Sequence, residues 1–272
     1  MSICHRVNVV LGVACLVALS TPASADHAWG SYHWARNSNP INLNLGDNLT
    51  SAWDPYLQTA SNDWSVSNVL DTSVVAGASS VRRCRAGTGR IEVCNSTYGN
   101  NGWLGVASIS ISGSHITSAS VRVNDTYFNT TRYNTTAWRN LVMCQEVGHA
   151  FGLDHQDENQ TNANLGSCMD YTNSPGTNQH PNAHDYEQLE LIYAHADGAA
   201  RMSASEAQPP AMRQIDLMGP GKWGRIVKRY PNGKPRIYEL DFGRGNRIIT
   251  HVYWAPHVQL SADGSVVRDA DQ

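Results

Sequence analysis

The chain has 272 residues, with 20 basic and 23 acidic side chains and a formal net charge of −3. This length allows one substantial domain plus a smaller addition. It contains no internal repeat, nucleotide-binding loop or nucleic-acid motif, so we expect no nucleic-acid partner.

The first 25 residues have the pattern of a secretory signal peptide. Arg6 precedes an apolar run from Val7 to Leu19, and Ala23-Ser24-Ala25 then offers a cleavage site before Asp26. The run is too short to span a bilayer, and no other segment could do so. We therefore expect an exported mature chain of 247 residues, extracellular or periplasmic, that has no membrane partner after cleavage.

Alternating and helical patterns predict an α+β body over residues 26–198. A helix is predicted at 53–69, with Trp53, Leu57, Ala60 and Trp64 on one side. Candidate strands are at 41–45, 72–76, 91–94, 104–111 and 118–124.

A second helix is predicted to carry a metal site. Its apolar stripe consists of Trp138, Leu141, Val142, Val147, Ala150 and Phe151. Gln145 and His149 share one face of this helix, so both can reach a common metal. Glu146 stands beside them, placed to take a proton from a metal-bound water. Gly152 tolerates a positive φ and can end the helix, so that His155 returns as a third ligand.

Residues 145–155 match the zinc-protease pattern H-E-x-x-H-x-x-G-x-x-H except at Gln145, which replaces the first histidine. Met169 follows His155 by fourteen residues, within Ser167-Cys168-Met169-Asp170-Tyr171, which has the form of a Met-turn. The chain therefore resembles the metzincin metalloproteases over roughly residues 30 to 198, and the N-terminal part is most similar to a matrixin catalytic domain.

The resemblance implies a mixed, twisted sheet with an active-site helix and a C-terminal helix. It also implies a Zn²⁺ held by Gln145, His149 and His155, with Met169 as an apolar floor. Tyr171, as in the astacin and serralysin branches, would help to stabilise the oxyanion. In matrixin-like domains the strand at 104–111 is an exposed edge to which a substrate peptide adds. An ordinary half-buried strand is the alternative for this segment.

Four cysteines remain after the signal peptide, which suggests two disulfides in an oxidising compartment. Three pairings are possible. We favour Cys84 with Cys94, closing a short loop, and Cys144 with Cys168, tying the active-site helix to the Met-turn. Additional metal ligation by these cysteines is the less favoured alternative.

Residues 157–164 are rich in oxygen-bearing side chains, so Ca²⁺ is conceivable there. An ordinary polar connection is the favoured interpretation. A final helix is predicted at 185–196, capped near Asn182 or Ala183. His180 and His184, just before it, are candidates for the missing metal ligand, although we favour surface or capping roles for them.

Charge changes sign near residue 199. Residues 26–198 hold 8 basic and 16 acidic side chains, whereas residues 199–272 hold 11 and 7. Residues 199–213 have the composition of a linker, and 214–272 predict a small basic β-hairpin-rich appendage. Docking of this appendage onto the acidic body is favoured over contact with an anionic polymer.

The sequence thus predicts a secreted, monomeric zinc endopeptidase that acts on protein or peptide substrates, with Glu146 as general base. The alternative is a noncatalytic metzincin-fold protein that binds peptides or glycans. Gln145 supports that alternative, because an amide oxygen is a poorer zinc ligand than imidazole.

Overall fold

The computed structural model describes residue 1 and residues 27–198, 208–262 and 264–268. The predicted signal peptide lies outside the described residues apart from Met1, and so does the first part of the predicted linker, 199–207. Cleavage and export therefore stay predictions.

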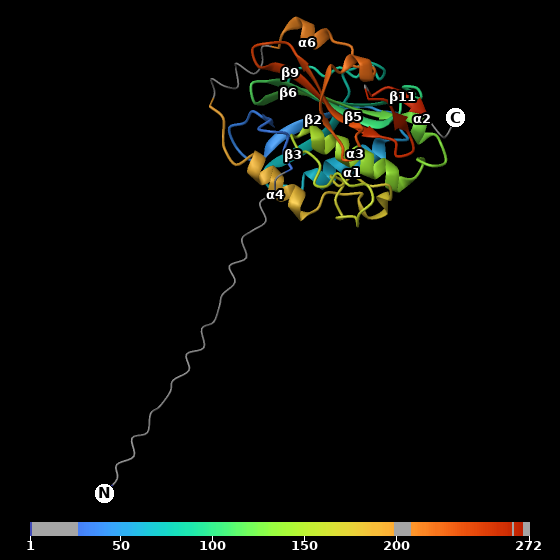
Figure 1. The fold of residues 1–272 in the computed structure, drawn as a ribbon. Coiled ribbons are helices and arrows are strands. Elements are labelled where there is room, and N and C mark those ends of the chain that lie inside the picture. Colours follow the sequence, from blue (N-terminus) through green and yellow to red (C-terminus); the bar gives the residue numbers. More distant parts are fainter. Residues whose placement is uncertain (2–26, 199–207, 263, 269–272) are drawn as a thin grey trace.

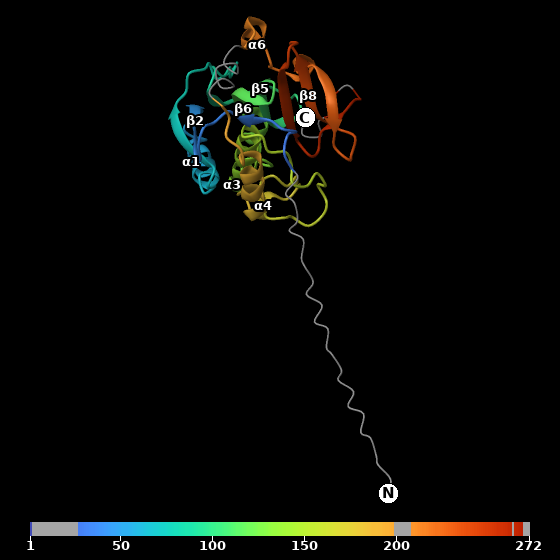
Figure 2. The same cartoon turned by 90° about the vertical axis from the view of Figure 1, so that its left-hand side faces the viewer.

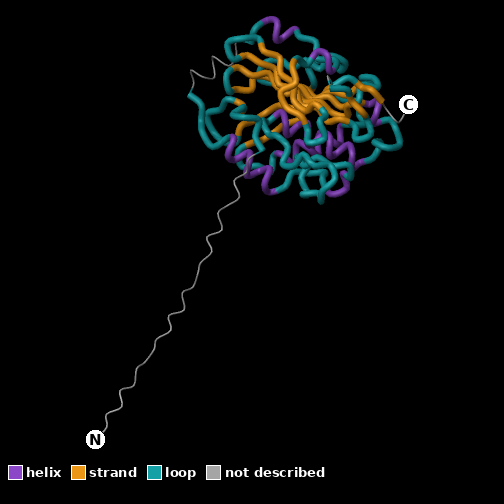
Figure 3. The backbone as a smooth tube through the Cα atoms, in the orientation of Figure 1, coloured by secondary structure: helices purple, strands orange, loops and turns teal. Residues whose placement is uncertain are grey.

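A mixed, twisted sheet of nine strands runs through the centre of the molecule (Figures 1 and 3). Its order is β3-β2-β4-β6-β5-β9-β8-β7, with β1 pairing the start of β6. The strands are β1 (His33–Trp34), β2 (Ile41–Asn48), β3 (Leu70–Ala76), β4 (Ile91–Ser96), β5 (Trp103–Ser112), β6 (His115–Asn124), β7 (Arg225–Arg229), β8 (Pro235–Asp241) and β9 (Asn246–Trp254). Strands β3, β2, β4 and β6 are parallel, whereas β6, β5, β9, β8 and β7 alternate in direction.

Helices cover one face of this sheet (Figure 2). They are α1 (Asp54–Trp64), α2 (Asp125–Phe128), α3 (Thr136–Ala150) and α4 (Ala183–Ile192), with α6 (Pro210–Gln214) on the opposite side. Two 3-10 turns (Pro175–Thr177 and Pro220–Lys222) and a short ribbon of β10 (Gln259–Leu260) with β11 (Val266–Arg268) complete the described elements. None of the described helices is long and apolar enough to cross a membrane. The predicted α+β class with a mixed sheet is confirmed.

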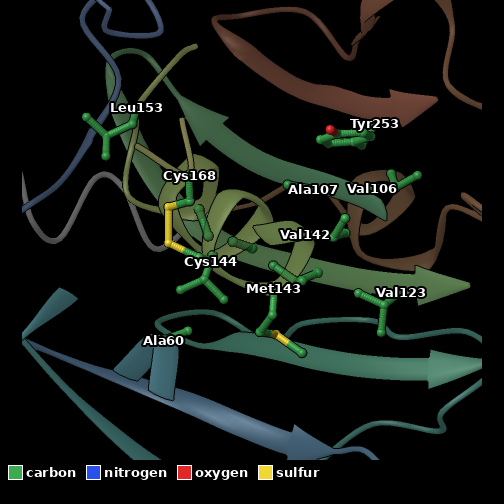
Figure 4. Close-up of a cluster of buried hydrophobic side chains, with 14 of the residues drawn as sticks. Ala60, Val106, Ala107, Val123, Val142, Met143, Cys144, Leu153, Cys168 and Tyr253 are labelled. Atoms are coloured by element: carbon green, nitrogen blue, oxygen red, sulfur yellow. A yellow bond between two sulfur atoms is a disulfide. The ribbon is translucent and has the colours of Figure 1, made fainter. Parts of the chain in front are cut away.

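The core forms where α3 packs against β5 and β6. Val142 and Met143 of α3 lie against Val106, Ala107 and Val123 of the two strands (Figure 4). The apolar stripe predicted for α3 accounts for this packing, since all six of its residues are buried. All residues from 141 to 150 are buried, so this part of α3 is enclosed on every side and not only along the predicted stripe.

The C-terminal strands belong to the same sheet as the body. Within the segment predicted to be rich in β-hairpins, β7, β8 and β9 pair in antiparallel order, but β9 also pairs with β5, from Trp103 opposite Trp254 to Ser112 opposite Asn246. The expectation of an exposed edge at 104–111 is therefore wrong for this structure. An apolar edge strand exposes unpaired backbone groups, and β9 satisfies them. Where one domain ends and the next begins stays a prediction.

An N-terminal arm, residues 27–36, crosses the end of α3. The backbone N–H of Trp29 donates to the carbonyl of Gly152 at 2.9 Å. Gly152 has φ +99°, and a Cβ there would lie 2.4 Å from the carbonyl oxygen of Tyr32. Only glycine therefore allows the chain to turn at Gly152 and the arm to lie this close.

Helix α4 begins with a capping box, and its Asp185 also accepts a hydrogen bond from Ser167 in the segment with the form of a Met-turn. Asn182 accepts from the N–H of Asp185, and the Asp185 carboxylate accepts from the N–H of Asn182. Ser167 donates its hydroxyl proton to the same carboxylate at 2.6 Å. The predicted cap near Asn182 is confirmed.

This buried carboxylate leads to a pH-dependent prediction. Burial raises the pKa of Asp185 to about 6. A raised folded-state pKa contributes stability that is present below the unfolded pKa and lost as pH rises through about 6. The Asp185→Asn variant keeps an acceptor oxygen but cannot ionise. We therefore expect the free energy of unfolding to lose up to about 3 kcal/mol of its change with pH in this variant. Urea unfolding at several pH values between 4 and 7 measures it, with the exposed Asp71→Asn as control. A wild-type stability that is flat over this window would contradict the prediction.

Candidate metal and catalytic site

Three histidines converge at the end of α3. The ligand atoms of His149, His155 and His251 all lie within 4.8 Å of one another, and all three residues are buried. His149 ends α3, His155 follows the Gly152 turn, and His251 comes from β9. His251 was missed from the sequence, because one histidine in an apolar strand carries no local signal of metal binding.

The hydrogen bonds of His149 present its Nε2 to this cluster. Its Nδ1 donates to the carbonyl of Leu153 at 2.9 Å, and its Nε2 lies 3.1 Å from Nε2 of His155. Burial lowers the pKa of His149 to about 4 and that of His155 and His251 well below the ordinary value. Neutral imidazole is the form that binds metal, so the cluster is suited to a cation at neutral pH.

His251 has no hydrogen-bond partner at either ring nitrogen among the described residues. Its ring stacks on Trp29 of the N-terminal arm, with centroids 3.4 Å apart. A buried imidazole without a partner is costly. A zinc ion shared with His149 and His155 would satisfy it, and three imidazoles are a common catalytic zinc set.

Gln145 lies on the same face of α3 as His149 and is fully buried. Its Nε2 donates to the carbonyl of Cys168 at 2.7 Å, which ties α3 to the Met-turn. Its Oε1 has no partner among the described residues. Metal ligation by Gln145 stays a prediction, with an unpaired amide oxygen available for it.

Glu146 is fully buried against β5. A Cβ on Gly105 would lie 2.6 Å from its Oε1, so the absence of a side chain at Gly105 makes room for this carboxylate. Burial raises the pKa of Glu146 well above its ordinary value. A carboxylate with a raised pKa is suited to take up a proton and return it.

The Met-turn lies beneath this helix. A Cβ on Gly148 would approach the Met169 sulfur to 2.7 Å, and Met169 is fully buried. The Tyr171 ring lies 5.5 Å from that of His155, and its hydroxyl donates to the carbonyl of Trp254 in β9 at 3.0 Å. Tyr171 is thus near the histidines, but in this structure its hydroxyl is engaged by β9.

Both favoured disulfides are present in the structure, Cys84–Cys94 and Cys144–Cys168. The second joins α3 to the Met-turn beside the Gln145 contact. None of these cysteines is left to bind a metal.

Ion pairs hold the C-terminal strands to the loop after α3. Arg236, fully buried in β8, contacts Asp154 at 2.8 Å and Glu158 at 2.5 Å, and Lys228 of β7 contacts the same two carboxylates. Basic side chains of β7 and β8 thus pair with acidic side chains of the body, as expected for contact between these two parts of the chain. Arg236 also lies 3.2 Å from Nδ1 of His155.

Calcium receives no support. Asp157, the first acidic residue of the 157–164 segment, accepts from the N–H of Asn159 and from the side chain of Asn162. Its oxygens therefore stabilise local turns. His180 pairs with Asp63 at 2.6 Å, and His184 stacks on His27, so neither joins the three-histidine cluster.

No family model and no curated protein matches the chain. It is similar to two solved structures of myroilysin, each at 16% identity; they cover 63% and 65% of this chain and 100% and 97% of theirs, with TM-scores of 0.38 and 0.34. It is also similar to high choriolytic enzyme 1, a hatching enzyme zinc-protease from the medaka fish Oryzias latipes, at 13% identity over 62% of this chain and 98% of that one, with a TM-score of 0.33. Likeness of this size does not assign the chain to a family.

Proposed function

We propose that the protein is a secreted zinc-dependent endopeptidase and that the structure is its closed form. The convergence of three buried imidazoles supports this function above all, with the buried carboxylate of Glu146 three residues before His149 on α3. A neutral His₃ set is suited to zinc, and a carboxylate with a raised pKa is suited to proton transfer.

In the closed form the zinc ligands are His149, His155 and His251. His251 reaches the site only because β9 pairs with β5. If β9 separated from β5, His251 would leave with it, and Gln145, whose Oε1 has no partner among the described residues, would be the residue available to hold the ion with His149 and His155. The two ligand sets thus belong to the closed and the open form.

Zinc would polarise the scissile carbonyl and make a bound water more acidic. Glu146 would serve as the general base that accepts a proton from the attacking water and as the acid that returns it to the leaving amine. Tyr171, released from the carbonyl of Trp254, donates its hydroxyl to the oxyanion.

Strand β9 occupies the place that an extended substrate would take. It runs antiparallel along β5, and residues 251–254 lie opposite 103–107, the part of β5 next to Glu146. The carbonyl of Trp254 already accepts the Tyr171 hydroxyl, as a substrate carbonyl would. Peptide or protein substrates would add to β5 by the same backbone hydrogen bonds.

Export is supported by the two disulfides, which persist in oxidising compartments. The signal-peptide pattern at residues 1–25 gives the route.

Zinc analysis combined with a casein-cleavage assay tests this function. Restoring histidine with Gln145→His should tighten zinc binding and keep or raise proteolysis, because imidazole is a better zinc ligand than an amide oxygen. Gln145→Ala is the matched control: it should lower proteolysis, which uses the open form, and leave zinc binding by His149, His155 and His251 in the closed form. A wild type that neither binds zinc nor cleaves casein with zinc added would favour the noncatalytic peptide- or glycan-binding alternative.

A further inference from the structure

A second cluster of metal-ligating side chains lies away from the three histidines at the end of α3. It consists of His33 in β1, His115 at the start of β6, and His195 and Asp197 just after α4. His33, His115 and Asp197 are buried, whereas the side chain of His195 is about half exposed. Three separate parts of the chain thus bring together the tips of these side chains, the Nε2 atoms of the histidines and Oδ1 of Asp197.

Ligand atoms of His33, His115 and Asp197 all lie within 4.8 Å of one another, and His195 lies close to two of these residues. Oδ1 of Asp197 lies 3.1 Å from Nε2 of His115, 3.5 Å from Nε2 of His33 and 3.8 Å from Nε2 of His195. Nε2 of His195 and Nε2 of His33 are 3.2 Å apart. Four ligands about 2.1 Å from a tetrahedral zinc would lie roughly 3.4 Å from one another.

The hydrogen bonds around the cluster leave Nε2 of His33 and Oδ1 of Asp197 as acceptors, and Nε2–H of His195 and of His115 donates to them when no metal is bound. The Nδ1–H of His33 donates to the carbonyl of Ser31 at 2.8 Å, so its Nε2 carries a lone pair. Oδ2 of Asp197 accepts from the N–H of Arg36 at 3.1 Å, which turns Oδ1 toward the histidines. Two acceptors, Nε2 of His33 and Oδ1 of Asp197, thus face each other across 3.5 Å. A cation bound there would take the place of the two protons that His115 and His195 donate, and such outer hydrogen bonds commonly orient metal ligands.

We propose that His33, His115, His195 and Asp197 bind a structural zinc ion. Four protein ligands leave no open position for water, so this site holds the fold together and does not take part in hydrolysis. The ion joins the N-terminal arm to β6 and to the end of α4. Trp29 belongs to the same N-terminal arm, and its ring stacks on His251. By fixing this arm, the ion would also hold Trp29 against the three-histidine cluster. The proposal does not depend on the protein being a peptidase.

Zinc content of the full chain, after loading and removal of free metal, tests this site. Wild type should hold two equivalents, His149→Ala one, Asp197→Asn one, and the double variant none. The matched control is His180→Ala, an exposed histidine that belongs to neither cluster, and it should hold two. Because His149→Ala removes only the other site, failure of the peptidase proposal leaves the second equivalent to be counted.

Thermal unfolding in the His149→Ala background gives a second readout. Added zinc should raise its unfolding midpoint, and a further Asp197→Asn should remove the rise. The His195→Ala variant is a second test that should not disturb folding, because the His195 side chain is half exposed. It should lower the zinc affinity at least about tenfold. The proposal is overturned if His149→Ala holds no zinc and its midpoint is unmoved by zinc. It is equally overturned if Asp197→Asn and His195→Ala leave content and affinity unchanged, as expected for protonated histidines around one aspartate.

Discussion

Proteolysis should fall by about a hundredfold to ten-thousandfold in the Glu146→Gln variant, while zinc binding stays near the wild-type level. Glutamine has nearly the shape of glutamate but cannot take a proton from water. Glu146 is buried against Gly105 and does not belong to the group of metal-ligating side chains formed by the three histidines. The amide of glutamine should therefore fit without disturbing that group. Casein cleavage and zinc titration on the same preparations separate the two effects.

Asp185→Asn is a suitable control for this experiment, because it removes a different buried carboxylate on α4. It should leave proteolysis largely intact at neutral pH. If Glu146→Gln still cleaves casein at the wild-type rate, Glu146 is not the general base and the proposed mechanism is wrong.

Proteolysis should rise when β9 is loosened, which is the second large effect. In the His251→Ala variant the closed form loses a zinc ligand and the ring stacked on Trp29. We therefore expect weaker zinc binding but faster casein cleavage at saturating zinc. A gain of activity is informative, because misfolding could only reduce it. Loss of activity even at saturating zinc would instead identify His251 as a permanent catalytic ligand.

A cross-link should have the opposite effect. The hydroxyls of Ser108 in β5 and Thr250 in β9 lie 2.9 Å apart, so cysteines at these positions face each other. The Ser108→Cys/Thr250→Cys variant should bind zinc and lose proteolysis, because β9 can no longer leave β5. Each single-cysteine variant is a control that should stay active. An oxidised double variant with full activity would show that β9 does not close the site.

Local patterns in the sequence predicted most of the elements and part of the site. The five candidate strands became β2 to β6, and the apolar stripe became α3, which carries Gln145, Glu146 and His149. The Met-turn form of residues 167–171 was recognised because Met169 and Tyr171 follow His155 at a typical distance, and its role at a metal site stays a prediction. In each case the signal lies within a few residues of the feature that it specifies.

The pairing of β9 with β5 could not be predicted in this way. Its cause is a match between two apolar strands far apart in sequence, and many strands in this chain have similar patterns. His251 was missed for the same reason. The cluster of His33, His115 and Asp197 likewise exists only because β1 pairs with β6 and the segment after α4 returns to the N-terminal arm.

The separation between β5 and β9 also affects the order in which the protein is made. Ser108 and Thr250, which face each other, are 142 residues apart. During synthesis from the N-terminus, β5 therefore emerges long before the strand that covers it, and such distant pairings form slowly. Until residues 246–254 arrive, the nascent chain has an open apolar edge that can pair with another chain. A chain interrupted before residue 246 should therefore aggregate more readily than the full-length protein.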